Sequence, residues 1–136
     1  MMTKNFSRSE FECECGCGED RISSDLIECL QLARDSFGRG ITINSGCRCP
    51  QRNKEVGGSS TSSHLLKTRD VNGNGWSGGV QETCVAADLK ATNSKDRFQL
   101  ISVLIESGIR RIGIGKDFLH VDIDPEKDKE VAWLYS

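Results

Sequence analysis

The chain has 136 residues, of which 36% are hydrophobic and 28% charged, and its formal net charge is −2. This length suits one domain, residues 1–136, with its own hydrophobic core, and is too short for two ordinary domains. The low charge, without any cluster of lysine and arginine, argues against nucleic acid as a partner, and no apolar run reaches the length of a membrane span. We therefore expect a single soluble domain that neither crosses a membrane nor binds nucleic acid.

The N-terminal segment contains no apolar stretch of the kind that a secretory signal needs. We expect a monomer that is made in the cytoplasm and acts outside the cell only after release. Seven cysteines are a high and odd number. Without an export signal, such thiols are more often reduced or bound to metal than paired in a disulfide framework, although one disulfide formed after release is an alternative.

In chain order, the first predicted element is a helix from about Ser24 to Phe37, with Ser24 or Asp25 as N-cap and Gly38 as the stop. Residues 40–46 alternate isoleucines with polar residues and predict a half-buried strand.

A loop is expected from Cys47 to Thr83. Within it, residues 67–83 are rich in glycine and asparagine and are interpreted as an inserted loop. Because long loops in compact domains are usually functional or mobile, this insertion is a candidate lid or substrate-selecting wall.

Residues 84–91 predict a short buried strand, and Ser94 is the expected cap of a second helix that ends at Gly108. The residues expected on its buried face are Phe98, Ile101, Leu104 and Ile105. Residues 110–115 and 118–124 predict a strand pair, and the tail at 130–136 predicts a last strand. Helices and strands mixed without a βαβ rhythm favour an α+β fold with a small, mostly antiparallel sheet flanked by helices.

His120 is one of two histidines in the chain. Side chains alternate along a strand, so Phe118, His120 and Asp122 share one face while the apolar residues between them form the core face. Taken alone, a histidine in this position is most simply a polar surface residue on an amphipathic strand. However, His64 stands in a small polar stretch before an apolar pair, and Asp88 interrupts an apolar strand, where a carboxylate needs solvent or a cation.

Two histidines and one carboxylate, with a water in the fourth position, are the ligand set expected of catalytic zinc. Nearby carboxylates, such as Asp117 and Asp122 beside His120, can serve such a site as further ligand, as partner of a ligand or as proton acceptor. We therefore predict Zn²⁺ bound by His64, Asp88 and His120.

Three stretches of the chain carry a known family pattern: SGCRCPQRNKEVGGSSTSSHLL, AADL and GIGKDFLHVDID. They resemble the zinc D-Ala-D-Ala carboxypeptidase-like, M15-type peptidases, a peptidoglycan-cutting family that includes phage endolysins and shares its fold with the hedgehog signalling domain. The family pattern is an arginine shortly after a strand, then SxHxxGxAxD, then an acidic residue three positions before a final histidine. The residues that fit it are Arg48, Ser62, His64, Ala86, Asp88, Asp117 and His120.

The resemblance implies a hydrolase in which Asp117 is the general base and Arg48 stabilises the oxyanion or holds a substrate carboxylate. Asp122 is the alternative base, or a residue that orients a ligand together with Ser62. The sequence departs from the family in spacing, because His64 and Asp88 lie 24 positions apart rather than seven. Asp70, six positions after His64, is the alternative ligand.

The resemblance also implies a peptidoglycan peptide as substrate and a cell-wall site of action, either after release or as part of a phage particle. A non-catalytic zinc-containing binding module of the same fold is the alternative function. A further departure from the family is Lys67, which stands where the pattern has glycine.

Cys13, Cys15 and Cys17 occupy every second position and are candidates for a structural metal, with a fourth ligand from Cys29, Cys47, Cys49 or Cys84. Structural zinc more often uses spacers of two to four residues, so buried or exposed free thiols are the simpler interpretation. A cysteine nucleophile at position 47, 49 or 84 is a further alternative, as is a cysteine-rich zinc-ribbon interaction protein.

Overall fold

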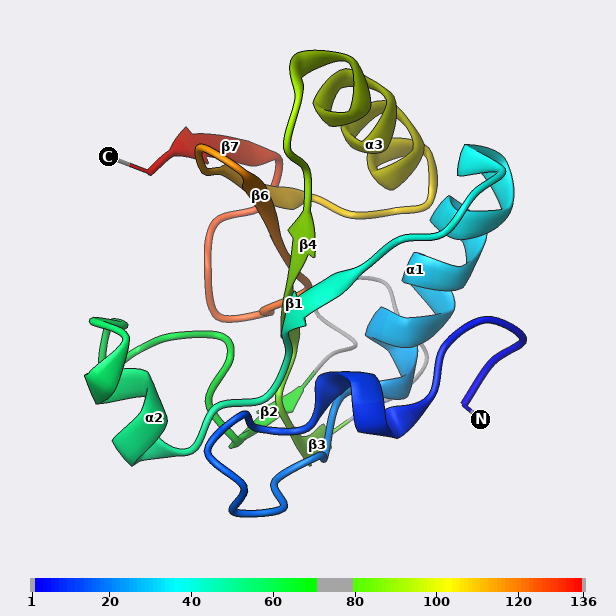
Figure 1. Cartoon of the computed structure of the whole chain (residues 1–136). Coiled ribbons are helices and arrows are strands. Elements are labelled where there is room, and N and C mark those ends of the chain that lie inside the picture. The colour runs from blue at the N-terminus through cyan, green and yellow to red at the C-terminus, as the bar shows by residue number, and fades with distance from the viewer. Residues whose placement is uncertain (1, 71–79, 136) are drawn as a thin grey trace.

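The computed structural model describes residues 2–70 and 80–135 of the chain (Figure 1). The elements in chain order are η1 (Arg8–Phe11), α1 (Ser24–Phe37), β1 (Ile43–Ser45), α2 (Pro50–Glu55), β2 (Lys67–Asp70), β3 (Val80–Thr83), β4 (Ala86–Lys90), α3 (Ser94–Glu106), β5 (Arg111–Ile114), β6 (Phe118–Asp122) and β7 (Val131–Leu134). This mixture confirms the predicted α+β class. Among the described residues, no helix is both long enough and apolar enough to span a bilayer.

The main sheet has five strands in the order β1-β4-β6-β5-β7. Its pairs are antiparallel except that of β5 with β7, which is parallel, so the sheet is mixed but mostly antiparallel as predicted. Strands β5 and β6 are paired, which confirms the predicted strand pair of residues 110–115 and 118–124. The C-terminal tail forms β7 at the edge of the sheet.

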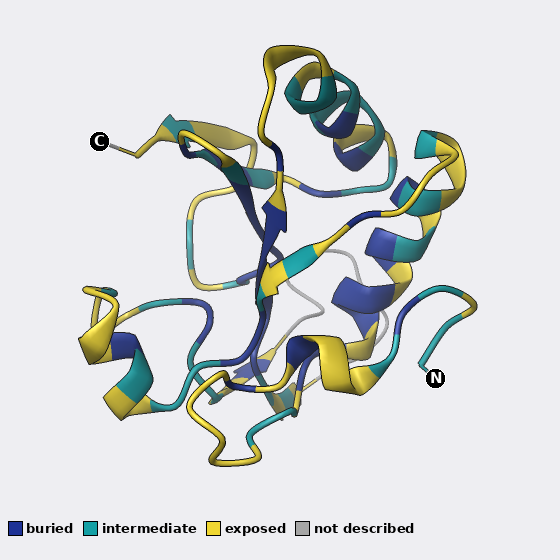
Figure 2. Cartoon of the chain, viewed as in Figure 1, coloured by how far each residue is buried: buried dark blue, intermediate teal, exposed yellow. Residues whose placement is uncertain are grey.

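Helices α1 and α3 pack together on one side of the sheet, while α2 and the loop after it lie on the other side (Figure 1). The core fills the space between the sheet and the two long helices. Leu89, Leu119 and Val121 point into it and are fully buried, as Figure 2 shows for their strands. The predicted core face of β6 is therefore confirmed, and the opposite face is free to carry polar side chains.

The two long helices lie where predicted, although α3 ends at Glu106, two residues before Gly108. Their N-caps differ from the prediction, because Ser23 caps α1 in place of Ser24 or Asp25, and Asn93 caps α3 in place of Ser94. In α1 the hydroxyl of Ser23, in extended backbone, accepts the Leu26 amide at 3.4 Å, and Gly38 ends the helix with φ 77° as predicted. In α3 the side chain of Asn93 accepts the Asp96 amide at 2.8 Å. Both caps are polar residues that still have extended backbone, as an N-cap requires.

The buried face of α3 agrees with the prediction in part, since Leu104 is buried and Ile101 packs partly buried against the core. Leu100 and Leu104, four positions apart, are buried, whereas Phe98 and Ile105 are exposed at 74% and 51%. This helix has more apolar residues than its buried stripe can hold, so periodicity alone wrongly includes Phe98 and Ile105 and misses Leu100.

The prediction of a continuous loop from Cys47 to Thr83 is wrong. Helix α2 and the β2–β3 hairpin lie within this range. In β2 the buried residue is Arg69, which donates to the carbonyls of Leu65 and Thr83 at 3.0 and 2.8 Å. Because the inward residue is charged, β2 lacks the apolar alternation that identifies a strand. Residues 71–79 of the interpreted insertion lie outside the described residues.

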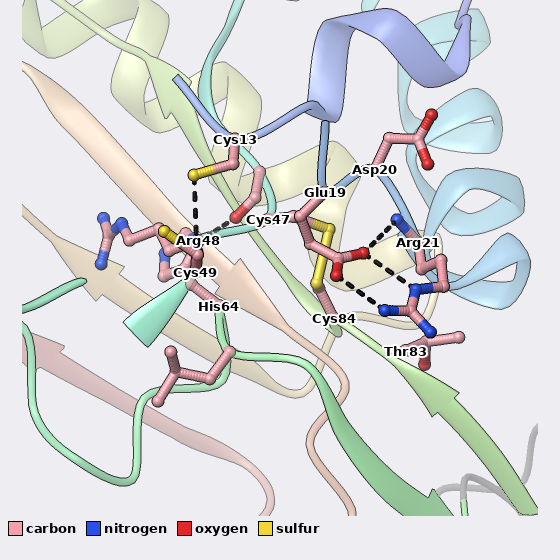
Figure 3. The surroundings of a disulfide bond; sticks show 12 residues. Cys13, Glu19, Asp20, Arg21, Cys47, Arg48, Cys49, His64, Thr83 and Cys84 are labelled. Atoms are coloured by element: carbon pink, nitrogen blue, oxygen red, sulfur yellow. Dashed lines mark hydrogen bonds and ion pairs between the residues drawn. A yellow bond between two sulfur atoms is a disulfide. The ribbon is translucent and has the colours of Figure 1, made fainter. Parts of the chain in front are cut away.

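The N-terminal segment packs against the sheet ahead of α1. Phe6 and Phe11 are buried there, and the carbonyl of Phe11 accepts the Cys47 amide at 2.8 Å. A disulfide joins Cys47 to Cys84 (Figure 3). The segment before β4 is thereby linked covalently to the residue that precedes Arg48.

Candidate metal centre

His64, Asp88 and His120 meet on the polar face of the sheet. Asp88 and His120 are directly opposite each other in the antiparallel pair of β4 and β6. The Oδ1 atom of Asp88 lies 3.1 Å from Nδ1 of His120 and 3.2 Å from Nε2 of His64. One ligand atom from each residue lies within 4.8 Å of the other two, and both histidines are buried.

The segment carrying His64 is fixed to the sheet by backbone hydrogen bonds. The amide of Arg48 donates to the carbonyl of His64 at 2.9 Å, and the amide of Val85 donates to that of Ser63 at 3.0 Å. The hydroxyl of Ser62 accepts the His64 amide at 3.2 Å. Ser62, predicted to support the site, thus holds the backbone of His64 rather than its ring.

The second nitrogen of each ring is also held by the protein. Nδ1 of His64 lies 2.6 Å from the carbonyl oxygen of Gly46, and Nε2 of His120 lies 2.7 Å from Oδ2 of Asp122. Because a carbonyl and a carboxylate only accept, these nitrogens donate, and in each neutral ring the lone pair faces Asp88. Two lone pairs directed at one carboxylate need a shared cation, so the donor set fits a metal ion.

Without a metal ion, a proton on one of the rings would take its place beside Asp88, and the pKa values describe that condition. Burial opposes ionisation of Asp88, yet hydrogen bonds from His120 and His64 hold the pKa of its carboxyl below its usual range. Burial is the main cause that lowers the pKa of His64, against the opposing effect of Asp88. For His120, hydrogen bonds with Asp122 and Asp88 outweigh burial and raise its pKa. A buried carboxylate therefore faces at least one neutral imidazole.

Arg48 lies beside this cluster. Its guanidinium pairs with Oδ2 of Asp88 at 3.0 Å and donates to the Ser45 hydroxyl at 3.3 Å. The two oxygens of Asp88 are thus divided, with Oδ1 facing the histidines and Oδ2 facing Arg48. This arrangement fixes the orientation of the carboxylate and keeps a cation next to the site.

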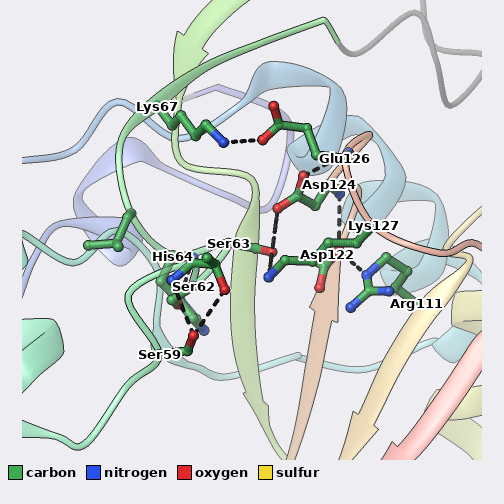
Figure 4. A network of polar contacts seen from close by, with 12 residues as sticks. Ser59, Ser62, Ser63, His64, Lys67, Arg111, Asp122, Asp124, Glu126 and Lys127 are labelled. Atoms are coloured by element: carbon green, nitrogen blue, oxygen red, sulfur yellow. Dashed lines mark hydrogen bonds and ion pairs between the residues drawn. The ribbon is translucent and has the colours of Figure 1, made fainter.

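Asp122 is buried behind His120 and pairs with Arg111, whose Nε lies 2.8 Å from its Oδ1 (Figure 4). Burial acts against its ionisation, but His120 and Arg111 lower the pKa of the Asp122 carboxyl. A charged carboxylate in this position holds His120 in one orientation and one tautomer.

A second polar cluster supports the loop next to His64 (Figure 4). The hydroxyl of Ser63 donates to Oδ2 of Asp124 at 2.7 Å and accepts from the Lys127 ammonium at 3.0 Å. Buried Arg69 approaches the other oxygen of Asp124 at 3.6 Å. The end of β6 and the turn after it are thereby tied to the residues that flank His64.

Two predicted site residues lie elsewhere. Asp117 is exposed on the turn before β6, its carbonyl accepts the Ala91 amide at 3.0 Å, and it is not among the described residues that line the cavity at the cluster. Asp70, the alternative ligand, is exposed on β2 and is not in the cluster of His64 with Asp88. Cys13, Cys15 and Cys17 gather on the N-terminal segment, away from the histidines.

A cavity of about 480 Å³ opens onto the cluster. Arg48, Asp88 and His120 contribute to its wall, and so do Trp133 and Tyr135 from the C-terminal tail. The ring centroids of His120 and Trp133 lie 5.5 Å apart. The sequence predicted that the tail is a strand of the sheet, but not that Trp133 and Tyr135 line the site. Their spacing of two residues, which places both side chains on one face of a strand, is the signal that could have revealed this.

The family model for Peptidase M15 matches residues 4–124 of the chain. The protein therefore belongs to the peptidase M15 family, which confirms the predicted resemblance and places it among zinc-dependent hydrolases of peptide bonds. No curated protein gives a significant match to the chain.

Proposed function

We propose that this protein is a zinc peptidase that hydrolyses peptide bonds in peptidoglycan stem peptides, as a D-Ala-D-Ala carboxypeptidase or an endolysin-type endopeptidase. The observation that carries the proposal is the convergence of His64, Asp88 and His120 beside a cavity, with both second ring nitrogens held by the protein. The family supplies the reaction class. The proposal includes a fold of the hedgehog and DD-peptidase type.

Zn²⁺ bound by Nε2 of His64, a carboxylate oxygen of Asp88 and Nδ1 of His120 would polarise the scissile carbonyl and lower the pKa of a bound water towards neutrality. Asp122 and the carbonyl of Gly46 accept hydrogen bonds from the other ring nitrogens, which keeps the proton of each neutral ring there and leaves the ligating nitrogens unprotonated. Three protein ligands leave one position for substrate or water, as catalytic sites require.

Arg48 is proposed to stabilise the negative charge that develops on the carbonyl oxygen, or to bind a substrate carboxylate. One of its terminal nitrogens is engaged with Asp88, and it lies in the cavity wall. Because Nε donates to Ser45, the N–H groups of the other terminal nitrogen are the donors proposed for the substrate.

Asp117 is proposed as the general base on the family pattern, and Asp122 is the alternative. Asp122 lies in the cavity wall but is committed to His120 and Arg111. Among the described residues, Asp117 is exposed and lies outside the cavity wall, so its role as base requires the turn before β6 to move when substrate binds. Catalytic contacts that form only in the substrate complex are common.

The cavity supports a peptide as substrate. Its volume of about 480 Å³ lies within the range of binding sites for small ligands. Trp133 and Tyr135 offer apolar surface on one side, while Arg48 and serines near His64 offer polar groups. An extended peptide needs both kinds of contact.

A non-catalytic zinc-containing binding module is the second candidate function. The exposed position of Asp117 favours it, because a site without turnover needs no base next to the bound water. In either case we propose that the protein is monomeric and acts at the cell wall, after release from the cell or as part of a phage particle.

The test is mass spectrometry of purified stem peptides incubated with the zinc-loaded protein, with and without a chelator. New masses that vanish with chelator and return with Zn²⁺ would support the peptidase and identify the bond. Unchanged peptides, from protein that carries zinc at His64 and His120, would favour the binding module.

A further inference from the structure

Four cysteine sulfurs converge on the surface formed by the N-terminal segment and the start of α2. Sγ of Cys15 lies 3.5 Å from the sulfurs of both Cys13 and Cys49. One sulfur from each of these residues and from Cys17 lies within 4.8 Å of the other three. A tetrahedral zinc ion with Zn–S bonds of about 2.3 Å places its sulfurs about 3.8 Å apart, so these separations are close to those of a bound ion.

The local backbone explains how closely spaced cysteines reach one centre. In an extended strand, residues two apart would share a face but lie about 6.6 Å from each other. Here Gly16 and Gly18 adopt φ of 85° and 87°, a left-handed conformation that glycine adopts without steric strain. The chain therefore folds back after Cys15 and again after Cys17. These turns bring the cysteine sulfurs together, although the one-residue spacers between the cysteines are shorter than those usual in structural zinc sites.

The segment is anchored on both sides of the cluster. The amide of Cys13 donates to the carbonyl of Glu19 at 2.7 Å, which closes the loop, and Glu14 pairs with Arg52 of α2 at 3.0 Å. The amide of Cys49 donates to Sγ of Cys13 at 3.4 Å (Figure 3). The amide of Arg52 donates to Sγ of Cys49 at the same distance. Hydrogen bonds to sulfur from the backbone are a recurrent feature of metal–thiolate sites.

The other three cysteines are committed elsewhere. Cys47 and Cys84 form the disulfide, and Cys29 is buried in α1, where its thiol donates to the carbonyl of Ser107 at 3.0 Å. Of the four residues open as a fourth ligand in the sequence, only Cys49 is thus available. Disulfides would join the clustered sulfurs only in pairs, whereas Cys15 contacts two neighbours equally, as it would around a shared ion.

We propose that Cys13, Cys15, Cys17 and Cys49 bind a structural zinc ion, separate from the histidine site. The ion would tie the N-terminal segment to α2 immediately after Arg48. Because the Arg48 amide also holds the His64 carbonyl, the ion would stabilise the backbone on which the cavity is built. The inference does not rest on the proposed function, since four thiolates leave no position open for catalysis.

The test measures metal content by elemental analysis of the full chain, purified without chelator and loaded with Zn²⁺. The wild type is expected to hold about two zinc ions, and the double variants Cys15→Ser/Cys17→Ser and His64→Ala/His120→Ala about one each. Cys29→Ala, which removes a thiol outside the cluster, is the matched control and should keep about two. Zinc content unchanged by the double cysteine variant would overturn the proposal.

A spectroscopic measurement on the wild type covers the case in which the cysteine variant fails to fold. Co²⁺ replacing zinc should give intense sulfur-to-cobalt charge-transfer absorption, and this absorption should persist in His64→Ala/His120→Ala. Absence of these bands from the cobalt-loaded protein, or a thiol count showing that the four cysteines are oxidised to disulfides under reducing purification, would contradict the site.

Discussion

Oδ2 of Asp122 accepts from Nε2 of His120 at 2.7 Å, and this contact decides which nitrogen of His120 faces Asp88. The two residues are neighbours on one face of β6, so the strand itself positions both the ligand and the carboxylate that orients it. Arg111 on β5 pairs with the same carboxylate and completes the arrangement.

Substituting Asp122→Asn should lower zinc affinity by about 10–100-fold, because an amide neither carries the charge nor fixes the tautomer of His120. Competition with a fluorescent zinc chelator measures the affinity. Asp128→Asn is the control, since its side chain is exposed and only its backbone carbonyl contacts Arg111. Equal affinities in the two variants would show that Asp122 does not orient the ligand.

Substituting Asp117→Ala should abolish hydrolysis while zinc remains bound, if Asp117 is the general base. Lys116→Ala, at the neighbouring exposed position, should keep its activity. The measurement is the rate of stem-peptide cleavage at matched zinc content. Full activity of Asp117→Ala would move the role to Asp122 or to a group outside this scheme.

Substituting Arg48→Lys should reduce kcat by about 100-fold or more, because an ammonium cannot hold Asp88 and donate to an oxyanion in one fixed geometry. Zinc content should stay the same, since Arg48 is not a ligand. Arg39→Lys, on an exposed arginine paired with Asp96, is the matched control. A change only in KM would instead indicate that Arg48 binds a substrate carboxylate.

Gly46 supplies the carbonyl that holds His64, and a side chain there would collide with the backbone of Phe11. An added Cβ would lie 2.6 Å from Cα of Phe11, whereas at Gly40 it would meet nothing within 4 Å. Gly46→Ala should lower the free energy of unfolding by about 1–3 kcal/mol and weaken zinc binding, while Gly40→Ala should do neither. Urea unfolding and zinc titration of both variants make the comparison. Wild-type stability in Gly46→Ala would exclude this tight packing.

The sequence predicted the elements whose side chains follow a simple period. In β6 the alternation of His120 with Leu119 and Val121 correctly separated the polar face from the core. Helix α2 was missed because its six residues are too few to show helical periodicity, and β2 because its inward residue is Arg69.

The convergence of the site depends on contacts that only the tertiary structure defines. The register that places Asp88 opposite His120 joins strands distant in sequence, and the preference for Asp88 over Asp70 rested on the family pattern. The carbonyl of Gly46 is a backbone group, which no motif reveals. Likewise, Cys49 as the fourth member of the sulfur cluster follows from the folding of two glycine turns.

The most direct test of the central claim is a crystal structure of the zinc-loaded protein with anomalous diffraction recorded at the zinc edge. We predict a peak about 2.0–2.2 Å from Nε2 of His64, Nδ1 of His120 and a carboxylate oxygen of Asp88. A zinc-loaded crystal without a peak between these atoms, with Asp88 bonded only to protonated histidines and Arg48, would contradict the account.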